Sequence, residues 1–125
     1  MSGSERPVVL IVEDEPDVTE TYRLWLESDC EVRVAADGDE GLSLLDAGVD
    51  VVLLDRRMPG LSGDDLLERI REQGLECRVA MVTAVEPDFD ILEMGFDAYL
   101  CKPIRSEKLH ETVRNLMDQI GRAHV

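Results

Sequence analysis

Short apolar runs alternate with amphipathic stretches along the whole chain, and no internal repeat, linker or low-complexity segment interrupts them. Runs that are mostly apolar, instead of strictly alternating with polar residues, are typical of strands buried on both faces of a sheet. Five such runs occur, at residues 8–12, 32–36, 51–54, 79–82 and 98–101. The pattern therefore predicts an α/β domain with a parallel sheet.

The stretches between these runs carry apolar residues at helical spacing. They predict helices at residues 16–28, 40–46, 63–73 and 106–120. Pro16 suits a first helical turn, Ser106 an N-cap, and Gly48 and Gly74 the positions that follow helix ends. The segment 85–95, with Pro87 near its start, leaves room for a shortened fourth helix of roughly two turns.

Five strand–helix repeats with right-handed crossovers favour one arrangement, the flavodoxin-like (βα)5 doubly wound sheet with strand order 2-1-3-4-5. Strands 1 and 3 then flank the switch point, where ligands bind in such sheets. Polar residues follow the apolar runs there: Glu13 and Asp14 after the first, Asp55 after the third, Thr83 after the fourth and Lys102 after the fifth. We expect them at one edge.

Clustered carboxylates repel one another unless a cation neutralises them. Oxygen ligands without a neighbouring histidine or thiol suit Mg²⁺ first and Mn²⁺ second. An aspartate such as Asp55 can attack phosphorus to form an acyl phosphate, while Lys102 and Thr83 contact the phosphoryl oxygens. Each residue also has a purely structural interpretation: Glu13-Asp14 as a helix cap, Lys102 as a solvent-exposed side chain and Thr83 as a packing residue of its strand.

Composition narrows the function classes. A chain of 125 residues with 44% hydrophobic residues is enough for one globular domain. A net charge of −15 excludes non-specific binding of nucleic acids or anionic membranes through this domain. Two lysines against eleven arginines, fourteen Asp and fourteen Glu indicate a salt-loving organism such as a haloarchaeon. An acidic domain from a GC-rich genome is the alternative.

Neither a membrane span nor a secretory signal is visible in the sequence, so we expect a cytoplasmic location. Cys30, Cys77 and Cys101 are odd in number and widely spaced, without a Cys-x-x-Cys pair. We interpret them as reduced thiols in the core or in loops, because neither a zinc site nor a disulfide framework fits that spacing.

Four motifs, each following a predicted strand in the right order, resemble those of a response regulator receiver domain. They are Val12-Glu13-Asp14-Glu15-Pro16, Leu54-Asp55-Arg56-Arg57-Met58-Pro59-Gly60, Val82-Thr83-Ala84 and Tyr99-Leu100-Cys101-Lys102-Pro103. The resemblance covers residues 7–121, which leaves 1–6 as an N-terminal tail and 122–125 as a C-terminal tail or the start of a linker.

The resemblance implies that Asp55 accepts a phosphoryl group from a sensor histidine kinase or a phosphotransfer protein. It implies that Asp14 and Asp55 ligate Mg²⁺ directly, that Glu13 acts through water, and that the Arg57 backbone carbonyl completes the protein ligands. Lys102, together with Thr83, is implied to contact the phosphoryl oxygens.

Tyr99 matches the aromatic residue that turns inward in this family when the threonine moves, and the Lys102-Pro103 bond is cis in many relatives. We expect Arg56 at the surface, and we hypothesise that the Arg57 side chain overhangs the site and slows hydrolysis. The shortened fourth helix weakens the case for the family's common dimer face. Apolar residues of that segment are candidate partner contacts or core residues, namely Phe89, Ile91, Leu92 and Met94.

The predicted function is a phosphorylation-operated switch of a two-component system that catalyses only its own phosphorylation and dephosphorylation. One alternative is an aspartyl-phosphate phosphatase of the haloacid dehalogenase type, which needs a second Asp where this chain has Arg57. Another is a pseudo-receiver that never carries phosphate. The chain is either a single-domain regulator or, as we slightly favour, part of a longer one; the kinase, the output partner and dimerisation stay open.

Overall fold

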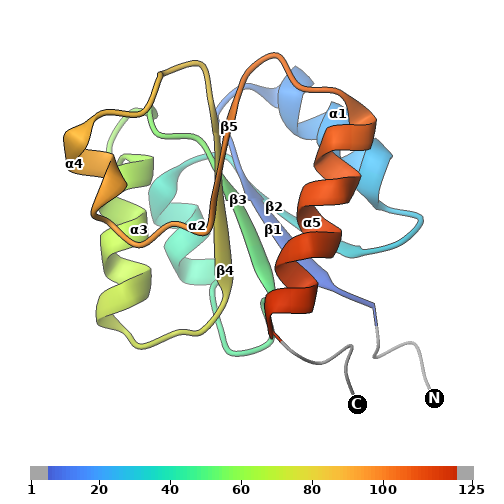
Figure 1. Ribbon diagram of the computed structural model, residues 1–125, viewed down its shortest axis with the longest axis horizontal. Helices are drawn as coiled ribbons and strands as arrows, with labels where there is room; N and C mark the ends of the chain where they lie inside the picture. The colour runs from blue at the N-terminus through green and yellow to red at the C-terminus, as the bar shows by residue number, and fades with distance from the viewer. Residues whose placement is uncertain (1–5, 121–125) are drawn as a thin grey trace.

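The computed structural model describes residues 6–120, in which five strands alternate with five helices (Figure 1). In chain order the elements are β1 (Val8–Val12), α1 (Pro16–Leu26), β2 (Glu31–Ala35), α2 (Gly38–Leu44), β3 (Val51–Leu54), α3 (Gly63–Glu72), β4 (Arg78–Thr83), α4 (Phe89–Leu92), β5 (Ala98–Cys101) and α5 (Ser106–Ile120). Every predicted strand is present, with its ends shifted by at most one residue.

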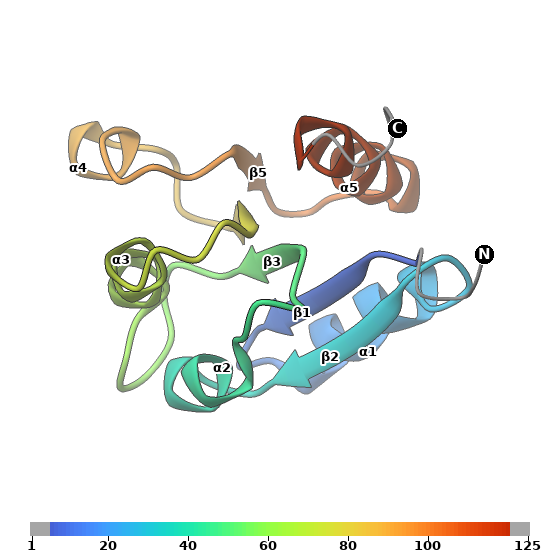
Figure 2. The ribbon, with the colours of Figure 1, turned by 90° about the horizontal axis from the view of Figure 1, so that it is seen from below.

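All neighbouring strands pair in parallel, in the order β2-β1-β3-β4-β5. This confirms the predicted flavodoxin-like topology. Figures 1 and 2 place α1 and α5 on one side of the sheet and α2, α3 and α4 on the other. The sheet is therefore the middle layer of three, and its inner strands β1, β3 and β4 are buried on both faces.

Each strand sends alternate side chains into two separate cores. Leu10, Val52 and Met81 pack on the side of α2, α3 and α4, where Leu66 is also buried. Their neighbours in the strands pack with α1 and α5 on the opposite side. This two-sided burial is the reason that the strands read as apolar runs instead of alternating ones.

Three helix ends differ from the sequence prediction by two residues. Helix α2 begins at Gly38, not at residue 40, because the Asp37 side chain accepts a hydrogen bond from the Glu40 amide at 2.8 Å and caps it. The backbone turns extended at Leu45, so Gly48 does not cap this helix. Helix α1 stops at Leu26 instead of near residue 28.

Helix α5 begins with Ser106 itself, so the prediction that Ser106 is the N-cap was wrong by one position. The Arg105 carbonyl accepts the Leu109 amide at 3.1 Å and already belongs to the first turn. Gly74 follows α3 with a φ of +72°, a conformation that glycine adopts easily, as the sequence predicted.

The fourth helix is a single turn, which confirms the prediction that it is shortened, although the predicted length of roughly two turns was too long. The Asp88 side chain caps it by accepting the Ile91 amide at 3.0 Å. Ile91 is fully buried and Met94 partly buried, as core residues are, whereas Leu92 is 59% exposed. Leu92 thus remains a candidate contact, while the side chain of Phe89 lies outside the described part.

All three cysteines are free thiols, as predicted, with Cys30 and Cys77 buried and Cys101 exposed. Burial raises the pKa of the Cys30 and Cys77 thiols above the ordinary value. Within residues 6–120, no helix combines the length and the apolar character needed to cross a membrane.

Candidate functional site

The register of the two central strands brings the predicted acids together. Val12 of β1 pairs with Leu54 of β3, and the Asp55 amide donates to the Val12 carbonyl at 3.2 Å. The residues that follow these strands therefore leave the sheet side by side. One carboxylate oxygen each from Glu13, Asp14 and Asp55 lie within 4.8 Å of one another. Glu13 and Asp55 are buried, whereas Asp14 is exposed.

Lys102 joins this cluster from the end of β5. Its Nζ donates to Glu13 Oε1 at 2.7 Å and to Asp55 Oδ2 at 3.0 Å. The Lys102 amide donates to the Thr83 carbonyl at 2.8 Å, which attaches this segment to the end of β4. The Lys102-Pro103 peptide bond is cis, as the resemblance implied.

The charges of these residues perturb one another. Burial raises the pKa of Glu13, and the negative charge of Asp55 adds to this effect, while the hydrogen bond from Lys102 opposes it. Burial also disfavours charged Lys102, but its hydrogen bonds to Glu13 and Asp55 outweigh burial and raise its pKa above the ordinary value. A single ammonium cannot neutralise three carboxylates, so the cluster retains an excess of negative charge.

The donor set fits a hard divalent cation. Its ligands are carboxylate oxygens of three residues, two of them buried and all at the carboxyl edge of adjacent parallel strands. Mg²⁺ prefers oxygen ligands, keeps several of its waters and accepts an exposed carboxylate as one partner. An acidic cluster of the composition that Mg²⁺ prefers is thus present in the described part of the chain.

Asp55 is held on two sides. Its Oδ1 accepts the Arg57 amide at 3.2 Å, while Lys102 occupies Oδ2. The start of α3 lies directly against its backbone, because the Gly63 amide donates to the Arg56 carbonyl at 3.0 Å. A Cβ atom on Gly63 would lie only 1.9 Å from the Asp55 carbonyl oxygen, so this approach requires glycine.

Thr83 and Tyr99 meet at the loop between β4 and α4. Thr83 is buried, and its hydroxyl accepts the Val85 amide at 3.4 Å. The Tyr99 hydroxyl donates to the Val85 carbonyl at 2.5 Å, and its ring packs edge-on against Phe96 with centroids 5.5 Å apart. The structure thereby links both predicted residues through Val85; the switching role of Tyr99 stays a prediction.

Arg56 is not a surface residue, and the sequence prediction for it was wrong. Only 8% of it is exposed. Its guanidinium forms a two-fold ion pair with Asp64 of α3, at 2.9 and 2.8 Å, and donates to the Tyr99 hydroxyl at 3.2 Å. The pair with Asp64 raises the pKa of Arg56 above its ordinary value. No local sequence signal marks this burial, because the partners lie eight and 43 positions away.

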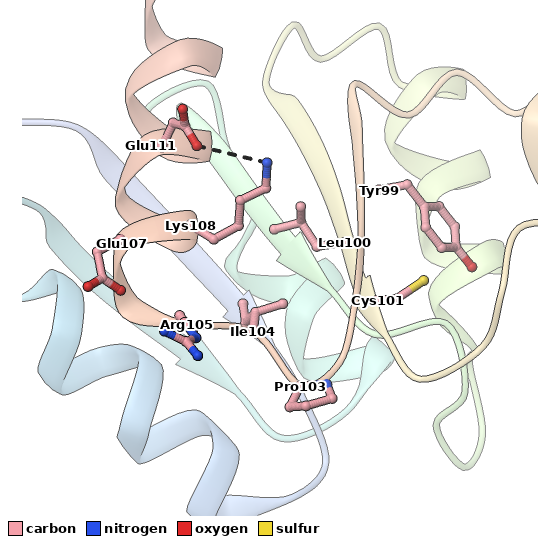
Figure 3. A pocket seen from close by; sticks show the side chains of 9 residues that line it. All are labelled: Tyr99, Leu100, Cys101, Pro103, Ile104, Arg105, Glu107, Lys108 and Glu111. Atoms are coloured by element: carbon pink, nitrogen blue, oxygen red, sulfur yellow. Dashed lines mark ion pairs between the residues drawn. The ribbon is translucent and has the colours of Figure 1, made fainter.

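A shallow groove runs along β5 and the first turns of α5 (Figure 3). Its apolar lining includes Leu100 and Ile104, and its rim carries the Lys108–Glu111 ion pair at 3.8 Å. Figure 3 shows that the Tyr99 ring points away from the α5 side chains, toward the opposite side of β5. Tyr99 thus faces the α3–α4 side, where Arg56 reaches it.

Comparison with known proteins agrees with this geometry. Residues 9–114 match the family model described as the response regulator receiver domain. A candidate transcriptional regulator of the haloarchaeon Haloferax volcanii is 56% identical over 115 residues, which are 91% of this chain and 20% of that protein. The transcriptional regulatory protein DltR of Streptococcus agalactiae is 37% identical over 111 residues, which are 85% of this chain and 50% of DltR.

Solved structures agree as well. A CheY-like receiver domain protein from Methanospirillum hungatei superposes with a TM-score of 0.84 at 27% identity, covering 92% of this chain and 96% of that one. The N-terminal domain of an uncharacterised protein from Wolinella succinogenes gives a TM-score of 0.85 at 33% identity, covering 95% and 99%. By contrast, the chain spans only a fifth of the Haloferax protein and half of DltR.

Proposed function

Because the chain belongs to the response regulator receiver domain family, we propose that it is a phosphorylation-operated switch whose phosphoacceptor is Asp55. Receiver domains act in signalling and do not turn over external substrates as ordinary enzymes do. One observation carries the assignment to Asp55: this carboxylate accepts a hydrogen bond from the Lys102 ammonium at 3.0 Å and has an oxygen within 4.8 Å of the two acids that follow β1. Residues 7–121 form the proposed receiver unit.

In the proposed reaction, an Asp55 carboxylate oxygen forms a bond to phosphorus while the bond from phosphorus to the donor's histidine nitrogen breaks. The Lys102 ammonium, already at the Asp55 carboxylate, moves its hydrogen bond to a phosphoryl oxygen as negative charge develops there. The Thr83 hydroxyl donates to a second phosphoryl oxygen. Positioning and charge neutralisation supply most of the acceleration in phosphoryl transfer.

The proposed metal ligands are the carboxylates of Asp14 and Asp55, the Arg57 carbonyl and, through water, Glu13. When bound there, Mg²⁺ would offset the excess negative charge of the cluster and of the incoming phosphoryl group. The excess itself supports this proposal, because Lys102 alone does not neutralise three carboxylates.

The proposed phosphoryl donor is a sensor histidine kinase or a phosphotransfer protein. The proposed location is the cytoplasm, where the ATP that supplies such a kinase is found. The output is a partner or a further domain, because this chain spans only a fifth of the Haloferax protein and half of DltR. The net charge of −15 supports an output that does not involve direct binding of nucleic acid by this domain.

Intact-mass spectrometry after incubation with acetyl phosphate and Mg²⁺ in high salt tests the proposal. The parent should gain one phosphoryl group, and the gain should disappear without Mg²⁺ and in Asp55→Asn. Asp29→Asn, at an exposed aspartate after α1, is the matched control and should be phosphorylated like the parent. A folded parent that gains no phosphoryl group would support a pseudo-receiver, and sustained hydrolysis of added phosphate esters would support a phosphatase.

A further inference from the structure

A buried arginine directly follows the proposed phosphoacceptor and binds three other parts of the fold. The Arg56 guanidinium pairs with Asp64 in the first turn of α3 and with Asp88, the cap of α4, at 3.5 Å. It also donates to the Tyr99 hydroxyl of β5 at 3.2 Å and to the Glu86 carbonyl at 3.5 Å. One side chain therefore connects α3, the β4–α4 loop and β5.

These contacts continue to the reaction site. Arg56 donates to the Tyr99 hydroxyl, which in turn donates to the Val85 carbonyl at 2.5 Å. The amide of Val85 donates to the Thr83 hydroxyl at 3.4 Å. Arg56 is the residue next to Asp55 in the chain. The hydrogen bonds through Tyr99 and Val85 therefore connect the segment that carries the phosphoacceptor with Thr83.

We propose that Arg56 is a positioning residue for phosphorylation of Asp55, acting through Tyr99 and Val85 to hold the Thr83 hydroxyl in place. This inference rests on the proposed function and adds to it a residue that touches neither the phosphoryl group nor the metal. The two-fold pair with Asp64 fixes the plane of the guanidinium. The third guanidinium nitrogen, Nη1, then donates to the Tyr99 hydroxyl oxygen. The hydroxyl proton is therefore free to donate to the Val85 carbonyl in the β4–α4 loop.

Arg56 also has a purely structural alternative role, the attachment of α3 to β3. The two roles differ in one respect: a structural arginine acts independently of Tyr99, whereas a positioning arginine acts through it. Mutational effects on one pathway are non-additive, and a double-mutant cycle measures this directly.

The test compares Arg56→Met, Tyr99→Phe and the double variant in the rate of phosphorylation by acetyl phosphate. Loss of one hydrogen bond from a charged donor, about 1.5 kcal/mol, corresponds to roughly tenfold in rate. We expect each single variant to be slower by about this factor and the double variant to be no slower than the slower single. Arg23→Met, which removes a half-buried arginine paired with Glu20 and with Glu27 beside α1, is the matched control.

A spectroscopic readout accompanies the rates. The chain contains only two tyrosines, Tyr22 and Tyr99, so 3-fluorotyrosine gives two fluorine resonances. Arg56→Met should shift the Tyr99 resonance and leave that of Tyr22 unchanged, and Tyr99→Phe assigns the signals. If Arg56→Met does not fold, Arg56→Lys retains the cation, removes the two-fold geometry and should show the same two effects.

Additive rate losses, or an unchanged Tyr99 resonance with a parental rate, would overturn the inference while leaving the proposed function intact. A parent that is not phosphorylated at Asp55 would refute the proposed function and the inference with it. The two failures are therefore distinguishable by the parent alone.

Discussion

Replacement of Gly63 by alanine should impair both folding and phosphorylation, because α3 begins in contact with the backbone of Asp55. A Cβ atom at this position would lie 1.9 Å from the Asp55 carbonyl oxygen, 2.7 Å from its carbonyl carbon and 2.8 Å from the Arg56 Cα. All three neighbours are backbone atoms, so no side-chain rotation can relieve the contact. Either the start of α3 or the phosphoacceptor segment must move.

The size of the effect follows from this geometry. Restoring a tolerable separation of about 3 Å requires a displacement of roughly 1 Å, which also stretches the hydrogen bond from the Gly63 amide to Arg56. Overpacking typically costs about 1–3 kcal/mol, and we expect the upper end here, since rigid backbone lies on both sides. For a domain of this length, about 3 kcal/mol lowers the melting temperature by roughly 10 °C.

Gly41→Ala is the matched control. The neighbours of its added Cβ are methyl groups of Val12 and Leu66 at 3.0–3.2 Å, and these can shift. The gain in helix propensity, up to about 1 kcal/mol, offsets that crowding. We therefore expect a change in the free energy of unfolding within about 1 kcal/mol of zero.

Urea unfolding followed by the fluorescence of Trp25, the sole tryptophan, measures the stability of both variants. Acetyl phosphate incubation measures the rate at Asp55. The reasoning is refuted if Gly63→Ala unfolds at the urea concentration of the parent and is phosphorylated at the same rate. A Gly41→Ala variant as unstable as Gly63→Ala would contradict it equally.

Three further predictions concern other parts of the molecule. Lys102→Met should slow phosphorylation about a hundredfold or more, because the cation at the developing charge is lost; a rate within threefold of the parent would contradict this. Cys101 should react with iodoacetamide in the folded protein while Cys30 and Cys77 react only on unfolding, as mapped by peptide mass spectrometry, and equal labelling of all three would be inconsistent with the structure. The first-turn amide of α4 lowers the pKa of the Asp88 carboxyl, so the cap is complete above the ordinary carboxyl pKa and is lost as pH falls through the lowered value. Amide exchange in α4, corrected for its intrinsic pH dependence, should therefore accelerate in acid in the parent but not in Asp88→Asn, and identical pH profiles would count against the cap.

The sequence alone determined the architecture and the composition of the candidate site. The central strands β1 and β3 are buried on both faces and apolar from end to end, so the first polar residue marks where each of these two strands ends. Asp55 and Glu13 were recognisable for this reason, and the parallel topology then required them to meet. The start of α2 was predicted two residues too late, although Asp37 followed by Glu40 is a capping signature that marks it.

Only the tertiary structure decided the burial of Arg56. An arginine after a strand has no periodicity that distinguishes a solvated side chain from a buried one. Its burial depends on Asp64, Asp88 and Tyr99 arriving from three separate elements, the last of them 43 positions away. Local propensities act within a few residues, whereas such contacts exist only after the whole sheet and both helix layers have packed, so no local pattern in the sequence could reveal them.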